Sequence, residues 1–312
     1  MYLVTGGGGF IGAHLVRALV RRGERVRVLD DESTGRRGRL RDVWDGVEWI
    51  AGDVRDEAAV ARACQGVEVV LHHAAVASVP ASVADPLGTH AVNVGGTLNV
   101  LRAAQAAGAR RVVFASSTAV YGDLPGSPKS EDMPVLPRTP YAVQKLAAES
   151  YCRIWQPLYG LETVALRYFN VFGPGQDPNG AYAAVIPRFI AALRAGQEPV
   201  IYGDGEQSRD FIYVGNVVEI NLLAATVPAA AGQVLNVGTG ARTTLNGLVR
   251  DLEAICERPI HPVHEPERPG DIHESVADIS RLRAVLGYEP TVPFARGLAW
   301  TVQAFEEDGA RM

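Results

Sequence analysis

A glycine-rich turn near the start of the chain most constrains the fold. The segment VTGGGGFIGAHL places Gly6, Gly9 and Gly12 between an apolar stretch at 2–5 and an amphipathic stretch typical of a helix. Glycines at this spacing let the backbone turn sharply and approach a pyrophosphate, while the helix N-terminus offers unpaired N–H groups to the anion. The segment therefore predicts the opening strand, turn and helix of a dinucleotide-binding, Rossmann-like fold.

The rest of the first half continues the alternation of apolar strands and helical stretches. Further strand candidates lie at 25–30, 47–53, 67–75, 110–117 and 161–170. Uninterrupted apolar strands separated by helices are typical of a parallel sheet that is covered on both faces. We therefore expect an α/β fold with a doubly wound parallel sheet over residues 1–173.

The pattern changes after Gly173, where proline and glycine become frequent. A strand near 233–238 is expected to return to the parallel sheet. Residues 174–232 and 239–312 are expected to form mainly a smaller, discontinuous C-terminal lobe that binds the substrate.

Composition excludes several classes of protein. The three cysteines, Cys64, Cys152 and Cys256, are far apart and lack metal-ligand spacing, and the adjacent His72 and His73 would face opposite sides of a strand. The net charge of -5 gives no footprint for nucleic acid. We find neither a signal peptide nor a long apolar span, so we expect a cytoplasmic protein that binds no metal, nucleic acid or membrane.

An acidic residue at the end of the second strand indicates the cofactor. Asp30 lies eighteen residues after Gly12, where a carboxylate can accept hydrogen bonds from both ribose hydroxyls of an adenosine and repel a 2′-phosphate. This favours NAD over NADP, although the nearby Arg36 and Arg37 could meet a phosphate. Asp53, after the third strand, is placed to meet the adenine edge.

A tyrosine and a lysine four residues apart indicate the chemistry. Only two of the chain's 30 basic residues are lysines, Lys129 and Lys145, and Lys145 follows Tyr141 on one face of a helix that Thr139 can cap. A neighbouring ammonium favours the phenolate, which can then take a proton from an alcohol during hydride transfer. Ser117, at the end of the fifth strand, can bridge the sugar hydroxyl and the phenol. The residues expected to hold NAD are Gly6, Gly9, Phe10, Ile11, Gly12, Asp30, Asp53, Val54, Ala74, Ala75, Asn93, Tyr141 and Lys145.

Together these motifs make the sequence resemble the extended short-chain dehydrogenase/reductase family, and within it the UDP-hexose 4-epimerases. The stretches that carry the resemblance are SSTAVYGDLP, TPYAVQKLAAE, RYFNVFGPGQDPNGAYAAVIPRF, VIYGDGEQSRDFIYV and RPGDIHESVADIS. The resemblance implies NAD that is reduced and reoxidised within one cycle, and a 4-keto sugar that turns over before C4 is inverted. It also implies a homodimer built through a four-helix bundle by the helices around 88–107 and 141–157.

The same resemblance implies how the UDP-sugar is held. Asn170 and Arg209 would bind the diphosphate together with Arg268, Asp271 would take a ribose or bridging contact, and Tyr202 beside Ile201 would lie against the uridine. The full set of expected substrate-binding residues is Ser78, Ser117, Thr118, Ala119, Asn170, Ala184, Val185, Ile201, Tyr202, Arg209, Arg268, Asp271 and Ser275.

Two departures from the wider family refine the expected reaction. Dehydratases carry an Asp-Glu pair where this chain has Thr118 and Ala119, and neither residue can supply the acid and base for loss of water. Ser275 is small where glucose-restricted members carry tyrosine, so N-acetylated UDP-hexoses are expected to fit as well as UDP-glucose and UDP-galactose. A UDP-glucuronate 4-epimerase, with Arg188 near the sugar carboxylate, and a net NAD-dependent oxidoreductase remain as alternatives.

Overall fold

The computed structural model describes residues 1–178, 184–267 and 273–310. A seven-stranded parallel sheet forms its centre, in the order β11-β6-β5-β4-β1-β2-β3. This confirms the expected Rossmann-like α/β fold. The strands are β1 (Tyr2–Thr5), β2 (Val26–Asp30), β3 (Val47–Ala51), β4 (Val69–His72), β5 (Arg111–Ser117), β6 (Glu162–Tyr168) and β11 (Val234–Val237).

Two apolar layers cover the faces of this sheet, because neighbouring residues of each strand point to opposite sides. In β1, Val4 packs with the helices of one layer and Leu3 with those of the other, and both are fully buried. The first layer contains α1 (Phe10–Arg21), α8 (Val214–Thr226) and α10 (Ser280–Leu286). The second contains α2 (Glu57–Cys64), α5 (Gly96–Ala106) and α6 (Pro140–Tyr159).

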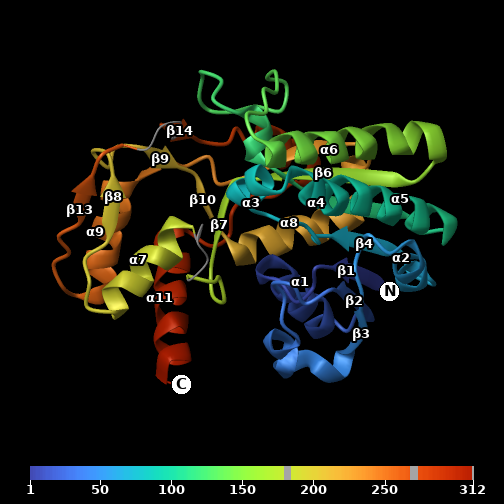
Figure 1. Cartoon of the computed structure of the whole chain (residues 1–312), viewed down its shortest axis with the longest axis horizontal. Helices are drawn as coiled ribbons and strands as arrows, with labels where there is room; N and C mark the ends of the chain where they lie inside the picture. Colours follow the sequence, from blue (N-terminus) through green and yellow to red (C-terminus); the bar gives the residue numbers. More distant parts are fainter. Residues whose placement is uncertain (179–183, 268–272, 311–312) are drawn as a thin grey trace.

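A second lobe has its own apolar core, built around Phe172, Phe189, Phe211 and Leu298. Figure 1 shows it beside the sheet, with α7, α9 and α11 packed around short strands. Its helices are α7 (Val185–Arg194), α9 (Leu245–Cys256) and α11 (Phe294–Ala310). Its strands are β7 (Asn170–Phe172), β8 (Val200–Tyr202), β9 (Ser208–Arg209), β10 (Phe211–Tyr213), β12 (Thr243–Thr244), β13 (Val263–Glu265) and β14 (Glu274–Ser275).

The chain crosses between the two lobes several times. It leaves the sheet after β6, returns through β10 and α8 to β11, and leaves again for α9. Lys129, in the loop before α6, pairs with Ala277 just after β14, and its ammonium donates to the carbonyl of Leu124. These crossings fix the second lobe beside the carboxyl ends of the parallel strands, where ligands bind in open α/β sheets.

Shorter elements complete the chain. The helical stretch expected around 88–107 is divided into α4 (Pro86–His90), a π-helical turn η2 (Ala91–Gly95) and α5, preceded by α3 (Val79–Ala84). The described residues also contain the 3₁₀ segments η1 (Arg37–Gly46), η3 (Thr118–Tyr121) and η4 (Pro228–Ala230). No helix among the described residues combines the length and apolar composition needed to cross a membrane.

Candidate active site

The glycine-rich turn between β1 and α1 leaves no room for side chains. A Cβ atom at Gly6, which has a φ of 68°, would lie 2.8 Å from the backbone nitrogen of Ala74. A Cβ atom at Gly12 would lie 2.1 Å from the carbonyl oxygen of Gly6. Gly9 precedes α1 without a side-chain cap, and the first turn of this helix carries no acidic residue. The turn therefore fits a pyrophosphate against the helix N-terminus.

Asp30 closes one end of the cavity that begins at this turn. Its carboxylate accepts hydrogen bonds from the backbone N–H groups of Gly8 and Glu32, each at 2.8 Å. Burial raises the pKa of Asp30, whereas these hydrogen bonds oppose the increase. The nearby Arg37 is bound to Glu32 at 3.0 Å and stacks over Trp49. The Asp30 carboxylate faces the cavity, and the Arg37 guanidinium is already paired with Glu32. This end of the cavity therefore suits the ribose diol of NAD better than the 2′-phosphate of NADP.

The three expected catalytic residues line the same cavity, whose volume is about 450 Å³. Ser117 ends β5, and Tyr141 and Lys145 lie in the first turns of α6, where Thr139 accepts a hydrogen bond from the N–H of Ala142. The Lys145 ammonium donates to the carbonyl of Ala115 at 2.8 Å. Its nitrogen lies 5.9 Å from the centroid of the Tyr141 ring. Strand β5 and helix α6 thus bring together an alcohol, a phenol and an ammonium.

Burial determines the titration of this group in the protein alone. It lowers the pKa of Lys145 to about 8, because the low-dielectric surroundings disfavour the charged amine. It raises the pKa of the Tyr141 phenol, and the hydrogen bond with Ser117 acts in the opposite direction. In the protein alone the pKa of the Tyr141 phenol is therefore raised, whereas the sequence predicts a lowered one. A lowered pKa would need the positive charge of a bound nicotinamide.

The two adjacent histidines, at the end of β4 and just after it, point to different partners. His72 contacts the hydroxyls of Thr5 and Thr97 at 2.7 and 3.0 Å, and burial lowers its pKa to about 3. His73 contacts the hydroxyl of Tyr168 at 2.9 Å. Within the described ranges, no group of His, Cys, Asp and Glu could hold a metal ion.

A second cavity, of about 380 Å³, opens into the smaller lobe and shares Val171 with the first. Asn170 lines it and donates to the carbonyl of Asp210 at 3.2 Å. Arg209 also lines it, and its strand pairs with β14 so that Arg209 lies opposite Ser275. The predicted residues that face this cavity are Asn170, Ala184, Val185, Tyr202 and Arg209. The cavity therefore has mainly apolar walls and the guanidinium of Arg209, and it lies next to the expected cofactor site.

Several predicted contact residues do not line either cavity, and the structure gives them other contacts. Asn93 is buried and accepts from the N–H of Val76 at 2.8 Å, so it braces the loop that borders the cofactor cavity. Asp53 forms an ion pair with Arg55 at 2.5 Å, and Ser78 caps α3. The Ile201 side chain belongs to the core of the second lobe. Those of the predicted residues that do line the first cavity are Gly6, Gly9, Phe10, Ile11, Gly12, Asp30, Val54, Ala74, Ala75, Ser117, Tyr141 and Lys145.

The remaining predicted residues lie near the turn after β5 or at β14. Thr118 and Ala119 form the start of η3, where the Ala119 N–H donates to Ser117, and they place no carboxylate beside Tyr141. Ser275 is buried in β14. Arg268 and Asp271 lie outside the described residues.

The sequence reasoning missed some residues of the first cavity. His73, Ser116, Tyr168 and Gln176 line it, as do Ser33, Thr34 and Gly35 after Asp30. Tyr168 could have been found from its place two residues before Asn170. His73 gave no such signal, because its contact with Tyr168 joins the residue after β4 to β6 across the intervening strand β5.

Comparisons with known proteins agree with this geometry. Residues 2–238 match the model of the NAD dependent epimerase/dehydratase family. A UDP-glucose 4-epimerase from Mycolicibacterium smegmatis is 42% identical over 97% of both chains. A UDP-N-acetylglucosamine 4-epimerase from Methanobrevibacter ruminantium, solved with UDP-N-acetylmuramic acid, is 42% identical with a TM-score of 0.94 over 98% of both chains. A Thermus thermophilus UDP-glucose 4-epimerase, solved with NAD, is 38% identical with a TM-score of 0.88 over 98% of both chains.

Proposed function

Because this chain belongs to the NAD dependent epimerase/dehydratase family, we propose that it interconverts the C4 epimers of UDP-hexoses. The observation that carries the proposal is the joint lining of one cavity by the glycine turn, Asp30, Ser117, Tyr141 and Lys145. Relatives named as UDP-glucose and UDP-N-acetylglucosamine 4-epimerases over nearly the whole chain support it.

The residues divide the work of binding and proton transfer. The glycine turn and Asp30 would hold the pyrophosphate and the adenosine ribose of NAD, and Lys145 would hold the nicotinamide ribose. When bound, NAD supplies reversible hydride acceptance at its nicotinamide ring. The Tyr141 phenolate would take the proton from the sugar O4, and the resulting phenol would return it to the same oxygen after the 4-keto sugar has turned its other face to the nicotinamide. The Ser117 hydroxyl would hold the sugar O4 by a hydrogen bond next to the Tyr141 phenol.

The turn after β5 favours epimerisation over the loss of water that dehydratases of the family catalyse. Loss of water from a sugar requires an additional acid and base, and the two residues after Ser117 are a threonine and an alanine. The two positions after Ser117 therefore add no acid or base to Tyr141, and one proton-transferring group suffices for oxidation and reduction at the same carbon.

The second cavity supports a nucleotide sugar as substrate. Asn170 and Arg209 would bind the diphosphate, because the Asn170 side-chain amide, held by the Asp210 carbonyl, and the Arg209 guanidinium can both donate hydrogen bonds to an anion. Tyr202 would lie against the uracil. Ser275 pairs with Arg209, which lines this cavity, and its small side chain would leave room for an N-acetyl group. We therefore infer that UDP-GlcNAc and UDP-GalNAc are substrates beside UDP-Glc and UDP-Gal.

One observation favours UDP-glucuronate as a second candidate substrate. Arg188 of α7 lines the second cavity and could pair with a sugar carboxylate. A turnover of UDP-glucuronate far above that of both neutral sugars would favour this reading over the first.

The test is incubation of the purified protein with UDP-GlcNAc, UDP-Glc or UDP-glucuronate, followed by NMR of the anomeric signals. We expect C4 epimers from the first two sugars, and no net change in free NADH, because the cofactor is restored in each cycle. The absence of any C4 epimer would reject the proposed function. Steady accumulation of free NADH would instead indicate a net oxidoreductase.

The outer face of α6 supports a homodimer. Exposed apolar side chains recur along this helix, next to α5 (Figure 1); they are Val143, Tyr151, Ile154, Leu158 and Tyr159. A continuous apolar stripe on a helix marks a packing surface. We propose that α5 and α6 pair with the same helices of a second copy of the chain to form a four-helix bundle.

A further inference from the structure

A buried ion pair lies one helical turn beyond Lys145. Glu149 follows Lys145 by four residues, so the two side chains share one face of α6. Arg167 of β6 nevertheless occupies the Glu149 carboxylate, with Nη2 and Nε at 2.6 and 3.0 Å from its two oxygens. The Arg167 and Glu149 side chains are only 4% and 1% exposed. The pair is therefore a two-point contact shielded from water, which is the strong form of a carboxylate–guanidinium interaction.

Further contacts fix this pair at both ends. Arg167 Nη1 donates to the Tyr121 hydroxyl at 2.9 Å, and the guanidinium carbon lies 4.8 Å from the centroid of that ring. The Tyr121 hydroxyl donates in turn to Asn236 at 2.7 Å. At the other end, Ser116 donates to Glu149 at 2.8 Å. The carboxylate is thus tied to the strand residue that precedes Ser117.

Lys145 has a different environment. Within residues 1–178, 184–267 and 273–310, no ion pair joins it to a carboxylate, and its ammonium is bound to the Ala115 carbonyl and lies over the Phe114 ring. The titratable and charged groups around it are Tyr141, Glu149 and Cys152 on α6, His72 at the end of β4 with His73 just after it, and Arg167 and Tyr168 on β6. Both histidines are held neutral by burial, so Glu149 carries the one negative charge of this set.

We propose that Arg167 is a positioning residue of the active site: by occupying both oxygens of Glu149, it keeps this carboxylate from pairing with Lys145 and leaves the ammonium charge directed at Tyr141. An unpaired carboxylate on the same helix face would attract the lysine and partly cancel its field at the phenol. The inference rests on the proposed function for the role of Tyr141 as acid and base, whereas the charge balance is a property of the folded chain.

The small number of lysines makes a direct test possible. In the full chain labelled with ε-¹³C-lysine, two side-chain NMR signals report Lys129 and Lys145, and Lys129→Arg assigns them. The bound-nucleotide content is matched between variants. Arg167→Met is expected to raise the pKa of Lys145 by about one unit, because Glu149 becomes its partner. Glu149→Gln is expected to lower it by a similar amount, because the guanidinium is then uncompensated. The double variant is expected to return to near the wild-type value.

Opposite signs separate charge balance from general damage, which would move both single variants in the same direction. Shifts of the same sign, or an unchanged Lys145 pKa in both folded variants, would overturn the proposal. If Arg167→Met does not fold, the sign of the shift in the isosteric Glu149→Gln variant decides alone. The kcat–pH profile on UDP-Glc is expected to move to higher pH in Arg167→Met and to lower pH in Glu149→Gln. A wild-type protein inactive on every UDP-sugar would reject the proposed function and leave the lysine titration intact as a test of the charge balance.

Discussion

At the scale of single residues, Lys145 carries its positive charge in a buried position, where the low-dielectric surroundings disfavour the charged amine. Burial lowers its pKa to about 8, whereas a lysine in an unfolded chain titrates near 10.4. The unfolded chain therefore binds more protons between these pH values, and this lysine makes the free energy of unfolding rise with pH across the interval. Below about pH 8 the unfavourable contribution of the buried charge is complete. Such a residue is typical of a functional site.

Replacement of Lys145 by methionine isolates this contribution. We expect Lys145→Met to unfold with a higher free energy than the wild type at pH 7.5, because a side chain of similar length then carries no buried charge. The advantage is expected to shrink by about 2 kcal/mol at pH 9.5, where the folded wild type has lost most of the charge. Urea unfolding of both proteins at the two pH values, at matched nucleotide content, provides the measurement. A difference that stays constant with pH would contradict the titration of Lys145.

The phenol of Tyr141 offers a second test at this scale. Tyr141→Phe is expected to lower kcat for C4 epimerisation by at least about a hundredfold, the usual size of general acid–base catalysis. NAD binding should persist, since the glycine turn and Asp30 are untouched. Tyr2→Phe, which removes a hydroxyl at the opposite end of the sheet, serves as the control and should keep wild-type kcat. A loss of less than tenfold would remove Tyr141 from its assigned role.

Ser275 is expected to set the choice of sugar. Ser275→Tyr fills the buried position opposite Arg209 and should reduce kcat/KM for UDP-GlcNAc at least tenfold more than for UDP-Glc, because only the former carries an N-acetyl group. Ser275→Ala preserves the space and should leave the ratio unchanged. Parallel kinetics on both sugars give the answer, and an equal effect of tyrosine on both would show that this position does not discriminate.

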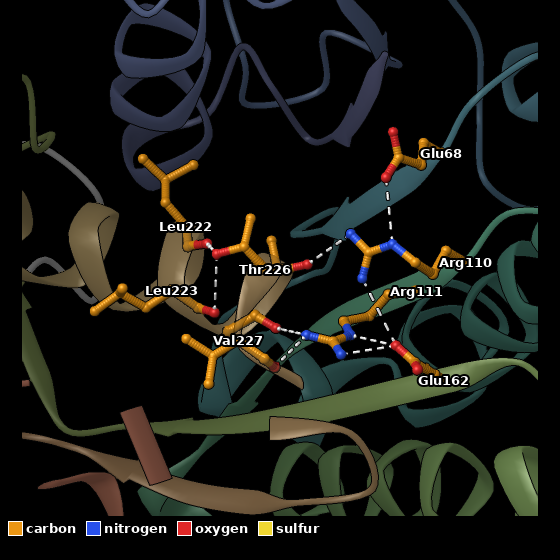
Figure 2. A network of polar contacts seen from close by, with 10 residues as sticks. Glu68, Arg110, Arg111, Glu162, Leu222, Leu223, Thr226 and Val227 are labelled. Atoms are coloured by element: carbon orange, nitrogen blue, oxygen red, sulfur yellow. Dashed lines mark hydrogen bonds and ion pairs between the residues drawn. The ribbon is translucent and has the colours of Figure 1, made fainter. Parts of the chain in front are cut away.

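At the scale of secondary-structure elements, a polar clamp joins the sheet to the end of α8. Figure 2 shows Arg111, at the start of β5, reaching the chain around Val227. Its Nη1 donates to the carbonyls of Ala224 and Val227 at 2.7 and 2.8 Å, and its Nε donates to Glu162 of β6 at 2.8 Å. The clamp satisfies carbonyls that the last turn of a helix leaves without partners. One side chain thereby fixes α8 against two strands.

The neighbouring Arg110 provides a matched control for this clamp. Arg111→Met is expected to lower the free energy of unfolding by about 2–3 kcal/mol, since it leaves the carbonyls of Ala224 and Val227 without this donor and Glu162 with only its longer contact to Arg110. Arg110→Met removes an arginine that is 39% exposed, and its loss should cost less than about 1 kcal/mol. Denaturant unfolding of the two variants tests the contrast. Equal destabilisation by both would mean that burial of Arg111 adds nothing.

Regular elements could be predicted from the sequence wherever one pattern decided them. The first strand was expected at 2–5 and lies at Tyr2–Thr5, because apolar residues and the following glycines leave one interpretation. The π-helical turn Ala91–Gly95 could not be predicted, because it depends on distant contacts. Asn93 within it binds the backbone of Val76 and the side chain of Gln144, both remote in sequence.

The candidate site was predictable where a residue's role follows from its place in a motif. Tyr141 and Lys145 share a helix face, and Ser117 ends a strand, so their convergence follows from the order of elements. Ile201 shows the opposite case, because strand β8 alternates between core and cavity and only the fold reveals which side Ile201 takes. Asp53 follows the third strand and is expected to meet the adenine edge, and the fold adds a contact with Arg55 that the strand pattern does not predict.

At the scale of the whole molecule, the exposed apolar side chains of α6 are the surface through which we expect two copies of the chain to form a homodimer. The double substitution Ile154→Glu with Leu158→Glu places two charges in the proposed bundle and should convert a dimer into a monomer, because burial of unpaired carboxylates is strongly unfavourable. Val263→Glu changes a half-exposed residue on β13 of the second lobe and should leave the dimer intact. Size-exclusion chromatography with light scattering distinguishes the outcomes. A monomeric wild type, or a dimer that survives the double substitution, would contradict the bundle.

The burial of both lysines has a consequence for the chemistry of the molecular surface. Lys129 and Lys145 are each only 4% exposed, and the other 28 basic residues are guanidines that stay protonated and do not acylate under mild conditions. Reagents that couple to primary amines therefore find no lysine side chain on the outside of the folded protein. Acylation of Lys129 or Lys145 would record moments when the fold opens around one of them, so that an ordinary surface-labelling reagent becomes a probe of the interior.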